Sequence, residues 1–340
     1  MDLAVVNVGM VTGIGLSAAA TCAALRCAID NFQETRFMID GDWLIGCEVP
    51  LPEPWRGERR LRELARAAIL DCLDGFVPEP GALPLFLCLP ESERPGRLIH
   101  DDNRFFLDLE KDLGWRCHPK SCTIPMGRVS IGVALRRARE LLRDRTIERI
   151  LIAACDSYLT AATLDALAEE DRLLTENNSD GFIPGEAGSA LLLERAFHSP
   201  SPLRMTGLGF GVEPAPINSG KPLRAEGLTQ AIKQALQDAG LSMGNLDFRI
   251  TDIAGEQYYF KEAALALART LRVRKEFFDI WHPGDCTGET GAAVGPIMVG
   301  MFKAACEKGY TQGPGVLLHL GNDDGRRVAM VMKWEVANGQ

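Results

Sequence analysis

Residues 282–295, HPGDCTGETGAAVG, bring a thiol, an imidazole and two carboxylates together in a chain of 340 residues. These groups belong to His282, Asp285, Cys286 and Glu289, and the same segment contains four glycines. A cysteine becomes a nucleophile when a nearby histidine takes its proton and a carboxylate orients that histidine, so this set could transfer or hydrolyse an acyl thioester. Because a glycine-rich loop does not enforce a contact between Cys286 and His282, ordinary loop polarity is the alternative interpretation.

A second candidate nucleophile is Cys122, in the segment SCTIPMGRVSIGVAL at residues 121–135. A thiol at the start of a buried helix is made more acidic by the helix dipole and the free backbone N–H groups. The helical pattern here begins at Pro125, a favoured residue in the first turn. Cys122 therefore precedes the predicted helix instead of beginning it.

Two other patterns are incomplete as binding motifs. Cys117 and His118 lie close to Cys122, but no second cysteine or histidine pair completes a zinc site. Residues 12–15, TGIG, resemble part of a dinucleotide-binding motif without its third glycine or its following acid. We therefore expect neither a metal nor a cofactor.

The elements that must position these residues alternate along the chain, as is typical of an α/β layer architecture. The predicted strands are residues 4–8, 83–89, 150–155, 189–194, 205–212, 248–253, 316–320 and 328–336. The predicted helices are residues 17–29, 58–73, 125–143, 224–239, 258–271 and 291–305. Both halves give a similar order of elements, and a stretch rich in proline and serine separates them. We therefore predict two similar halves, residues 1–197 and 203–340.

The composition excludes several classes of function. Hydrophobic residues make up 46% of the chain, and 37 basic residues against 46 acidic ones give a net charge of −9. We find no run of basic residues that would follow a phosphate backbone. The N-terminal segment has neither the basic start nor the apolar stretch of a signal peptide, and no segment has the roughly 18 apolar residues of a membrane span. We expect a soluble cytoplasmic protein that binds neither nucleic acid nor membrane and keeps its ten cysteines reduced.

Four segments resemble the β-ketoacyl synthases, the condensing enzymes of the thiolase fold. Residues 180–195, DGFIPGEAGSALLLER, are similar to the turn and last strand of that family's first half. Residues 5–25, VVNVGMVTGIGLSAAATCAAL, resemble its opening strand, turn and helix. Residues 121–135 resemble its nucleophile helix, and residues 288–298, GETGAAVGPIM, a motif of its second half. The resemblance implies an α/β thiolase fold of duplicated βαβαβαββ halves in a five-layer α-β-α-β-α sandwich, with the active site where the halves meet.

The same resemblance implies a reactive cysteine and two histidines, which this sequence lacks at the matching positions. The cysteine position falls on Ile124, the first histidine on Ala254 and the second on Glu289. Isoleucine cannot attack a thioester, and a methyl group donates no hydrogen bond. An exposed glutamate is only an acceptor at neutral pH, where the reaction needs a donor. We therefore predict a catalytically inactive protein with the fold of acyltransferases.

The enzymatic alternative is an acyl-thioester transferase or hydrolase with a displaced nucleophile. Its candidates are Cys122, two residues before the matching position, and Cys286 with His282. Two residues along an extended strand displace a side chain by about 6–7 Å. A displaced thiol therefore needs a rearranged site.

A fold without its reaction predicts a binding or adaptor protein. The resemblance extends to degenerate thiolase-like proteins of type VI secretion gene clusters, which implies an accessory role in effector loading. The other expected partners are acyl carrier protein and an active synthase, for which this chain would be a non-catalytic subunit. Residues 115–121 replace the apolar strand through which the family's subunits pair, and proline and charged residues there discourage the usual homodimer.

Overall fold

The computed structural model describes residues 1–39 and 41–335. Its main sheet follows the order β10-β9-β11-β12-β8-β1-β7-β6-β4-β5, and a separate hairpin consists of β2 (Gln33–Ile39) and β3 (Asp42–Gly46). None of the helices in the described ranges combines the length and apolar character needed to cross a membrane.

The first half of the chain forms the part of the sheet from β1 to β5. Its strands are β1 (Leu3–Thr12), β4 (Leu85–Leu89), β5 (Cys122–Pro125), β6 (Arg149–Ser157) and β7 (Glu186–Arg195). Read from the edge of the sheet, the order is β5-β4-β6-β7-β1. Counted along the chain, this is the third, second, fourth, fifth and first strand of the half. The fifth strand, β7, runs antiparallel to both of its neighbours, whereas β4 pairs in parallel with β5 and β6.

The second half repeats this topology. Its strands are β8 (Leu203–Val212), β9 (Phe248–Thr251), β10 (Ile280–Trp281), β11 (Gly315–Gly321) and β12 (Arg326–Trp334). They follow the same third, second, fourth, fifth, first order, and the fifth strand is again antiparallel to its neighbours. The two halves of the chain therefore share one strand order, with the fifth strand antiparallel to its neighbours in each. The predicted division between residues 197 and 203 lies between the end of β7 and the start of β8.

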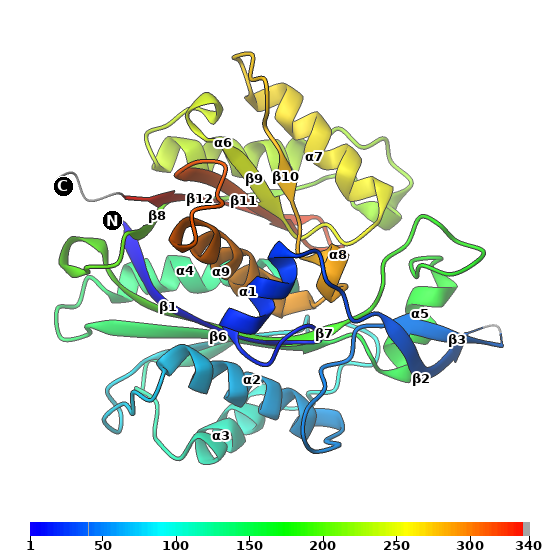
Figure 1. Cartoon of the computed structure of the whole chain (residues 1–340), viewed down its shortest axis with the longest axis horizontal. Coiled ribbons are helices and arrows are strands. Elements are labelled where there is room, and N and C mark those ends of the chain that lie inside the picture. The colour runs from blue at the N-terminus through cyan, green and yellow to red at the C-terminus, as the bar shows by residue number, and fades with distance from the viewer. Residues whose placement is uncertain (40, 336–340) are drawn as a thin grey trace.

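The strands of each half form one layer, and the helices lie between and outside these two layers to complete five (Figure 1). One outer layer holds α2 (Gly57–Leu73) and α3 (Asp102–Leu113), and the other holds α6 (Glu226–Asp238) and α7 (Gln257–Thr270). The central layer contains α1 (Ala18–Arg26), α4 (Ser130–Leu141) and α9 (Val294–Glu307). The shorter α5 (Ala161–Glu169) and α8 (Gly284–Thr287) lie near the junction of the halves. The expected α-β-α-β-α sandwich is thus confirmed.

The close fit of helix to strand also repeats between the halves. A Cβ on Gly9 of β1 would overlap the carbonyl of Ala68 in α2, and one on Gly209 of β8 would overlap the carbonyl of Ala231 in α6. Only glycine lets a helix approach a strand this closely. The outer helix of each half therefore lies on a glycine of that half's first strand.

Several elements escaped the sequence analysis. The hairpin β2–β3, helices α3 and α5, and the short strands β5 and β10 were not expected. Pro125 ends β5, and α4 begins at Ser130 after a single 3₁₀ turn. The predicted helix of residues 125–143 therefore starts five residues too early. The last predicted strand reached residue 336, which lies outside the described residues.

Candidate functional site

Ile124 lies at the junction of the halves, in the short strand β5. It is 2% exposed and pairs with Cys88 of β4. The hydroxyl of Ser130, the first residue of α4, donates to the Ile124 carbonyl over 2.9 Å. The central helix α4 is therefore anchored to β5 at Ile124, the aliphatic residue that the sequence comparison predicts at the place of a cysteine.

A buried arginine connects the two halves next to Ile124. Arg128 is 3% exposed and reaches from the turn before α4 into the second half. Its Nη1 donates to Glu289 Oε2 over 3.1 Å, and its Nη2 donates to the Tyr259 hydroxyl over 2.9 Å and also to the Asp323 carboxylate. The carboxylate of Asp252 lies 3.8 Å from Nε. One guanidinium thus faces three carboxylates of the other half.

A second arginine extends this cluster. Arg172 follows α5, is 5% exposed, and pairs with Glu256 through two hydrogen bonds. Its Nη1 also donates to Asp323 Oδ2 over 3.2 Å. Although burial opposes it, the two guanidiniums hold the pKa of Asp323 well below its usual range. We call the following residues the Arg128 network: Arg128, Arg172, Asp252, Glu256, Tyr259, Glu289 and Asp323.

Glu289 differs from its expected state. We expected an exposed acceptor, but the side chain is 4% exposed and lies inside the Arg128 network. Burial raises its pKa to about 7, and the Arg128 charge opposes this rise. Its Oε1 accepts from the Gly291 N–H over 2.8 Å. The expectation of exposure was therefore wrong, because the turn folds the carboxyl inward against an arginine 161 positions away.

Ala254 lies close to the same loop. It follows β9, and a Cβ on Gly284 would come within 2.8 Å of the Ala254 Cα. The structure therefore brings the end of β9 and the glycine-rich loop together. The three positions matched to the family's reactive set lie on β5, after β9 and in this loop, and none of them carries a thiol or an imidazole.

The alternative nucleophiles do not gather into one site. Cys286 in α8 is 5% exposed, and burial, then the Asp285 charge, raises the pKa of its thiol to about 11. His282 Nδ1 lies 3.0 Å from Asp285 Oδ1, and within the described residues no hydrogen bond joins His282 to Cys286. Cys122 lies on the edge strand β5, where Arg137 Nη1 is 2.8 Å from its sulfur. These contacts form no cysteine–histidine pair.

A cleft of about 580 Å³ opens above the Arg128 network. It lies between the loop after β4, helix α5 and the turn that joins β11 to β12. Arg172 and Asp323 belong to both the cleft lining and the network. The cleft is lined by Glu91, Ser92, Glu93, Arg94, Pro95, Pro125, Tyr158, Thr163, Ala166, Leu167, Glu170, Arg172, Asn218, Asn322, Asp323, Asp324 and Arg326.

The arginines of the cleft are already paired with acids. Arg94 donates to both oxygens of Asp156, over 2.6 and 2.9 Å, and its guanidinium lies 4.2 Å above the Tyr158 ring. Arg326 pairs with Asp324 at 3.1 Å. The lining holds five carboxylates and three guanidiniums. The lining therefore carries a net negative charge.

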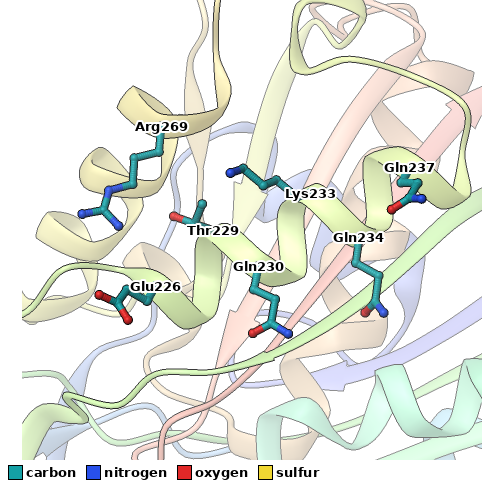
Figure 2. Close-up of a pocket in the computed structure, with 7 residues that line it drawn as sticks. All are labelled: Glu226, Thr229, Gln230, Lys233, Gln234, Gln237 and Arg269. Atoms are coloured by element: carbon teal, nitrogen blue, oxygen red, sulfur yellow. The ribbon is translucent and has the colours of Figure 1, made fainter.

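A second hollow, of about 460 Å³, lies on the outer face of α6 (Figure 2). Glu226, Thr229 and the side chains further along α6 line it together with Arg269 of α7. Gln234 in this group accepts from the Phe210 N–H over 2.6 Å, so part of the polar face serves the neighbouring strand β8. The hollow contains no cysteine or histidine, and it lies on an outer layer away from the junction.

Known proteins resemble this chain mainly in their structure. No protein-family model matches the sequence. The actinorhodin polyketide beta-ketoacyl synthase 2 of Streptomyces coelicolor is 28% identical over 151 residues, which is 42% of this chain and 36% of that protein. A ketosynthase bound to its acyl-carrier protein and a hexaketide matches with a TM-score of 0.81 at 15% identity, over 98% of this chain and 99% of that one. The chain has the ketosynthase fold.

Two further structures with this fold are of interest. The ishigamide ketosynthase/chain length factor matches with a TM-score of 0.74 at 17% identity, over 99% of this chain and 100% of that one. A ketosynthase in complex with its chain length factor from Xenorhabdus doucetiae has a TM-score of 0.74 at 14% identity, over 98% of each chain. The fold of this chain therefore also occurs in structures that contain a ketosynthase together with a chain length factor.

The arginines of the junction were not predicted from the sequence. Arg128 directly follows Gly127 in a segment that is otherwise mostly apolar, and Arg172 lies in the acidic stretch after α5. An arginine at the start of a buried helix must find carboxylate partners, and that was the available signal. Its partners, however, come from the other half of the chain.

Proposed function

We propose that this chain is a non-catalytic protein with a ketosynthase fold that acts by binding other proteins. The observation that carries the proposal is the Arg128 network, which occupies the junction beside Ile124, Ala254 and Glu289. A condensing reaction needs a thiol to hold the acyl group and neutral donors to stabilise the developing enolate. Here the corresponding residues supply a hydrocarbon, a methyl group and a carboxyl paired with arginine.

The electrostatics of the cleft support the same proposal. Acyl carriers and malonyl groups present phosphate and carboxylate charges, which require unpaired cations in the site. The guanidiniums of Arg94, Arg172 and Arg326 are each paired with a carboxylate of this chain. An anionic substrate would have to displace one of those carboxylates. A partner segment with basic or amide side chains fits the cleft better.

The finer proposal is an adaptor, an accessory that loads effectors onto a type VI secretion apparatus. Affinity purification from the native host, followed by mass spectrometry, should recover a protein other than acyl carrier protein. Glu170→Arg at the cleft should reduce that recovery by at least about tenfold, because it reverses a charge at the mouth. Glu226→Arg in the α6 hollow makes the same change on a distant face and should leave recovery unchanged (Figure 2). Recovery of acyl carrier protein alone would contradict the proposal.

A second candidate is a non-catalytic subunit paired with an active synthase. It is favoured by the likeness to two structures that contain a chain length factor. Against it, residues 115–121, which take the place of the family's pairing strand, form no strand, and the edge strand β5 that follows has only four residues and ends in Pro125. The same purification distinguishes the two candidates, because the second predicts a recovered partner with the ketosynthase fold and an intact cysteine.

A further inference from the structure

Phe197 projects into solvent in the connection between β7 and β8. Its side chain is 94% exposed, and its ring packs edge-on against His198 with centroids 5.1 Å apart. Phe197 also lines two hollows, of about 830 and about 500 Å³, that lie on either side of it. An aromatic side chain so placed gains stability when a second surface covers it, and aromatic residues are enriched at protein interfaces.

Arginines surround this phenylalanine. Arg143 and Arg145 line the larger hollow and are exposed, and neither guanidinium forms an ion pair or hydrogen bond within the described part of the chain. They belong to residues 136–149, RRARELLRDRTIER, with six arginines against three acids in a chain of net charge −9. The segment therefore has an excess of basic over acidic residues in an otherwise acidic protein.

Two more arginines build the surface. Arg195 Nη1 donates to the carbonyls of Leu142 and Ile147, over 3.0 and 2.7 Å, which fixes the turn that carries Arg143 and Arg145. Arg204 lines the smaller hollow and is 9% exposed. Its Nη1 has no hydrogen-bond partner among the described residues. Its Nε donates to Glu335 and its Nη2 to the Ser199 carbonyl, each over 3.1 Å, so this guanidinium holds the wall of the smaller hollow in place.

This surface is remote from the cleft. Arg149 lines the larger hollow at the start of β6, and Tyr158 lines the cleft just beyond the end of β6. Nine steps of about 3.3 Å along the extended chain separate Arg149 from Tyr158, so these two residues lie about 30 Å apart. Figure 1 shows β6 running from the side of the N-terminus towards α5.

We propose that the surface around Phe197 binds an acidic segment of a partner protein that carries an aromatic or aliphatic side chain next to its carboxylates. The carboxylates pair with Arg143 and Arg145, since guanidinium and carboxylate match in geometry. The apolar side chain packs on Phe197. This inference goes beyond the adaptor role, because it adds a second binding surface that needs no occupant in the cleft.

The test uses the full chain and a fluorescein-labelled peptide of eight aspartates and glutamates around one phenylalanine. Fluorescence anisotropy at low salt should show saturable binding. Arg143→Glu combined with Arg145→Glu should weaken binding at least about tenfold, and Phe197→Ala should weaken it about fivefold or more. The matched control is Arg272→Glu combined with Arg274→Glu, the same charge change at exposed positions after α7. It should change the Kd by less than about twofold. Thermal unfolding checks that each variant is folded.

Three results would overturn the proposal. Equal weakening by the two arginine pairs would show only a general effect of net charge. Unchanged affinity for a peptide with alanine in place of its phenylalanine would show that no apolar contact with Phe197 contributes to binding. Tighter binding of a single-stranded oligonucleotide of equal charge than of the peptide would assign the surface to nucleic acid.

Discussion

Arg128→Met is expected to lower the free energy of unfolding by about 3–5 kcal/mol, because it leaves buried carboxylates without their cation. Arg128 is 3% exposed and faces Glu289, Asp252 and Asp323. With the average unfolding entropy per residue, a loss of this size lowers Tm by about 4–7 °C. Chemical denaturation and differential scanning calorimetry measure both quantities.

Arg326→Met is the matched control for this substitution. Arg326 pairs with Asp324 at 3.1 Å, but both side chains are partly exposed, by 50% and 43%. Its loss should cost less than about 1 kcal/mol. Adding Glu289→Gln to Arg128→Met should restore part of the stability, since it removes one uncompensated charge. If Arg128→Met cost no more than Arg326→Met, the Arg128 network would not hold the halves together.

Gly291→Ala is expected to destabilise the protein by about 2–5 kcal/mol, the sum of backbone strain and overpacking. Gly291 has φ +54°, and a Cβ there would overlap the carboxylate of Asp156. That carboxylate is fully buried and held by Arg94, so it has no room to move away. The glycine spacing of the loop thus has a structural purpose that does not depend on catalysis.

Gly240→Ala separates the two contributions. Gly240 follows α6 with φ +64°, and a Cβ there would meet no atom within 4 Å. It should cost only the backbone strain, about 1–2 kcal/mol. Equilibrium unfolding in urea compares the two variants. Equal losses at Gly291 and Gly240 would mean that the contact with Asp156 contributes nothing.

The sequence contained enough information to predict the fold but not its shortest elements. The strands β1, β7, β8 and β12 are nine or ten residues long and gave clear apolar runs. Strands β5 and β10 have four and two residues, too few for any periodicity to appear. Helix α3 was missed although its signals are present, since Asp101 caps its first turn and Gly114 ends it in the left-handed conformation.

The segments around Ile124, Ala254 and Glu289 were singled out by recognisable glycine patterns, and the family roles matched to these residues stay a prediction. The state of Glu289 was not predictable in the same way. Its burial depends on Arg128, and local sequence gives no information about partners 161 residues apart. The same limit applies to Arg172, whose partners Glu256 and Asp323 come from the other half.

The most direct test of the proposed absence of catalysis is the intact mass of the purified chain after incubation with acyl-CoA and acyl carrier thioesters, with an active ketosynthase as the positive control. A chain without a reactive thiol at the junction should show no acyl adduct while the control is fully acylated. A stable adduct that disappears in Cys122→Ala or Cys286→Ala would contradict the proposal and establish an enzyme with a displaced nucleophile.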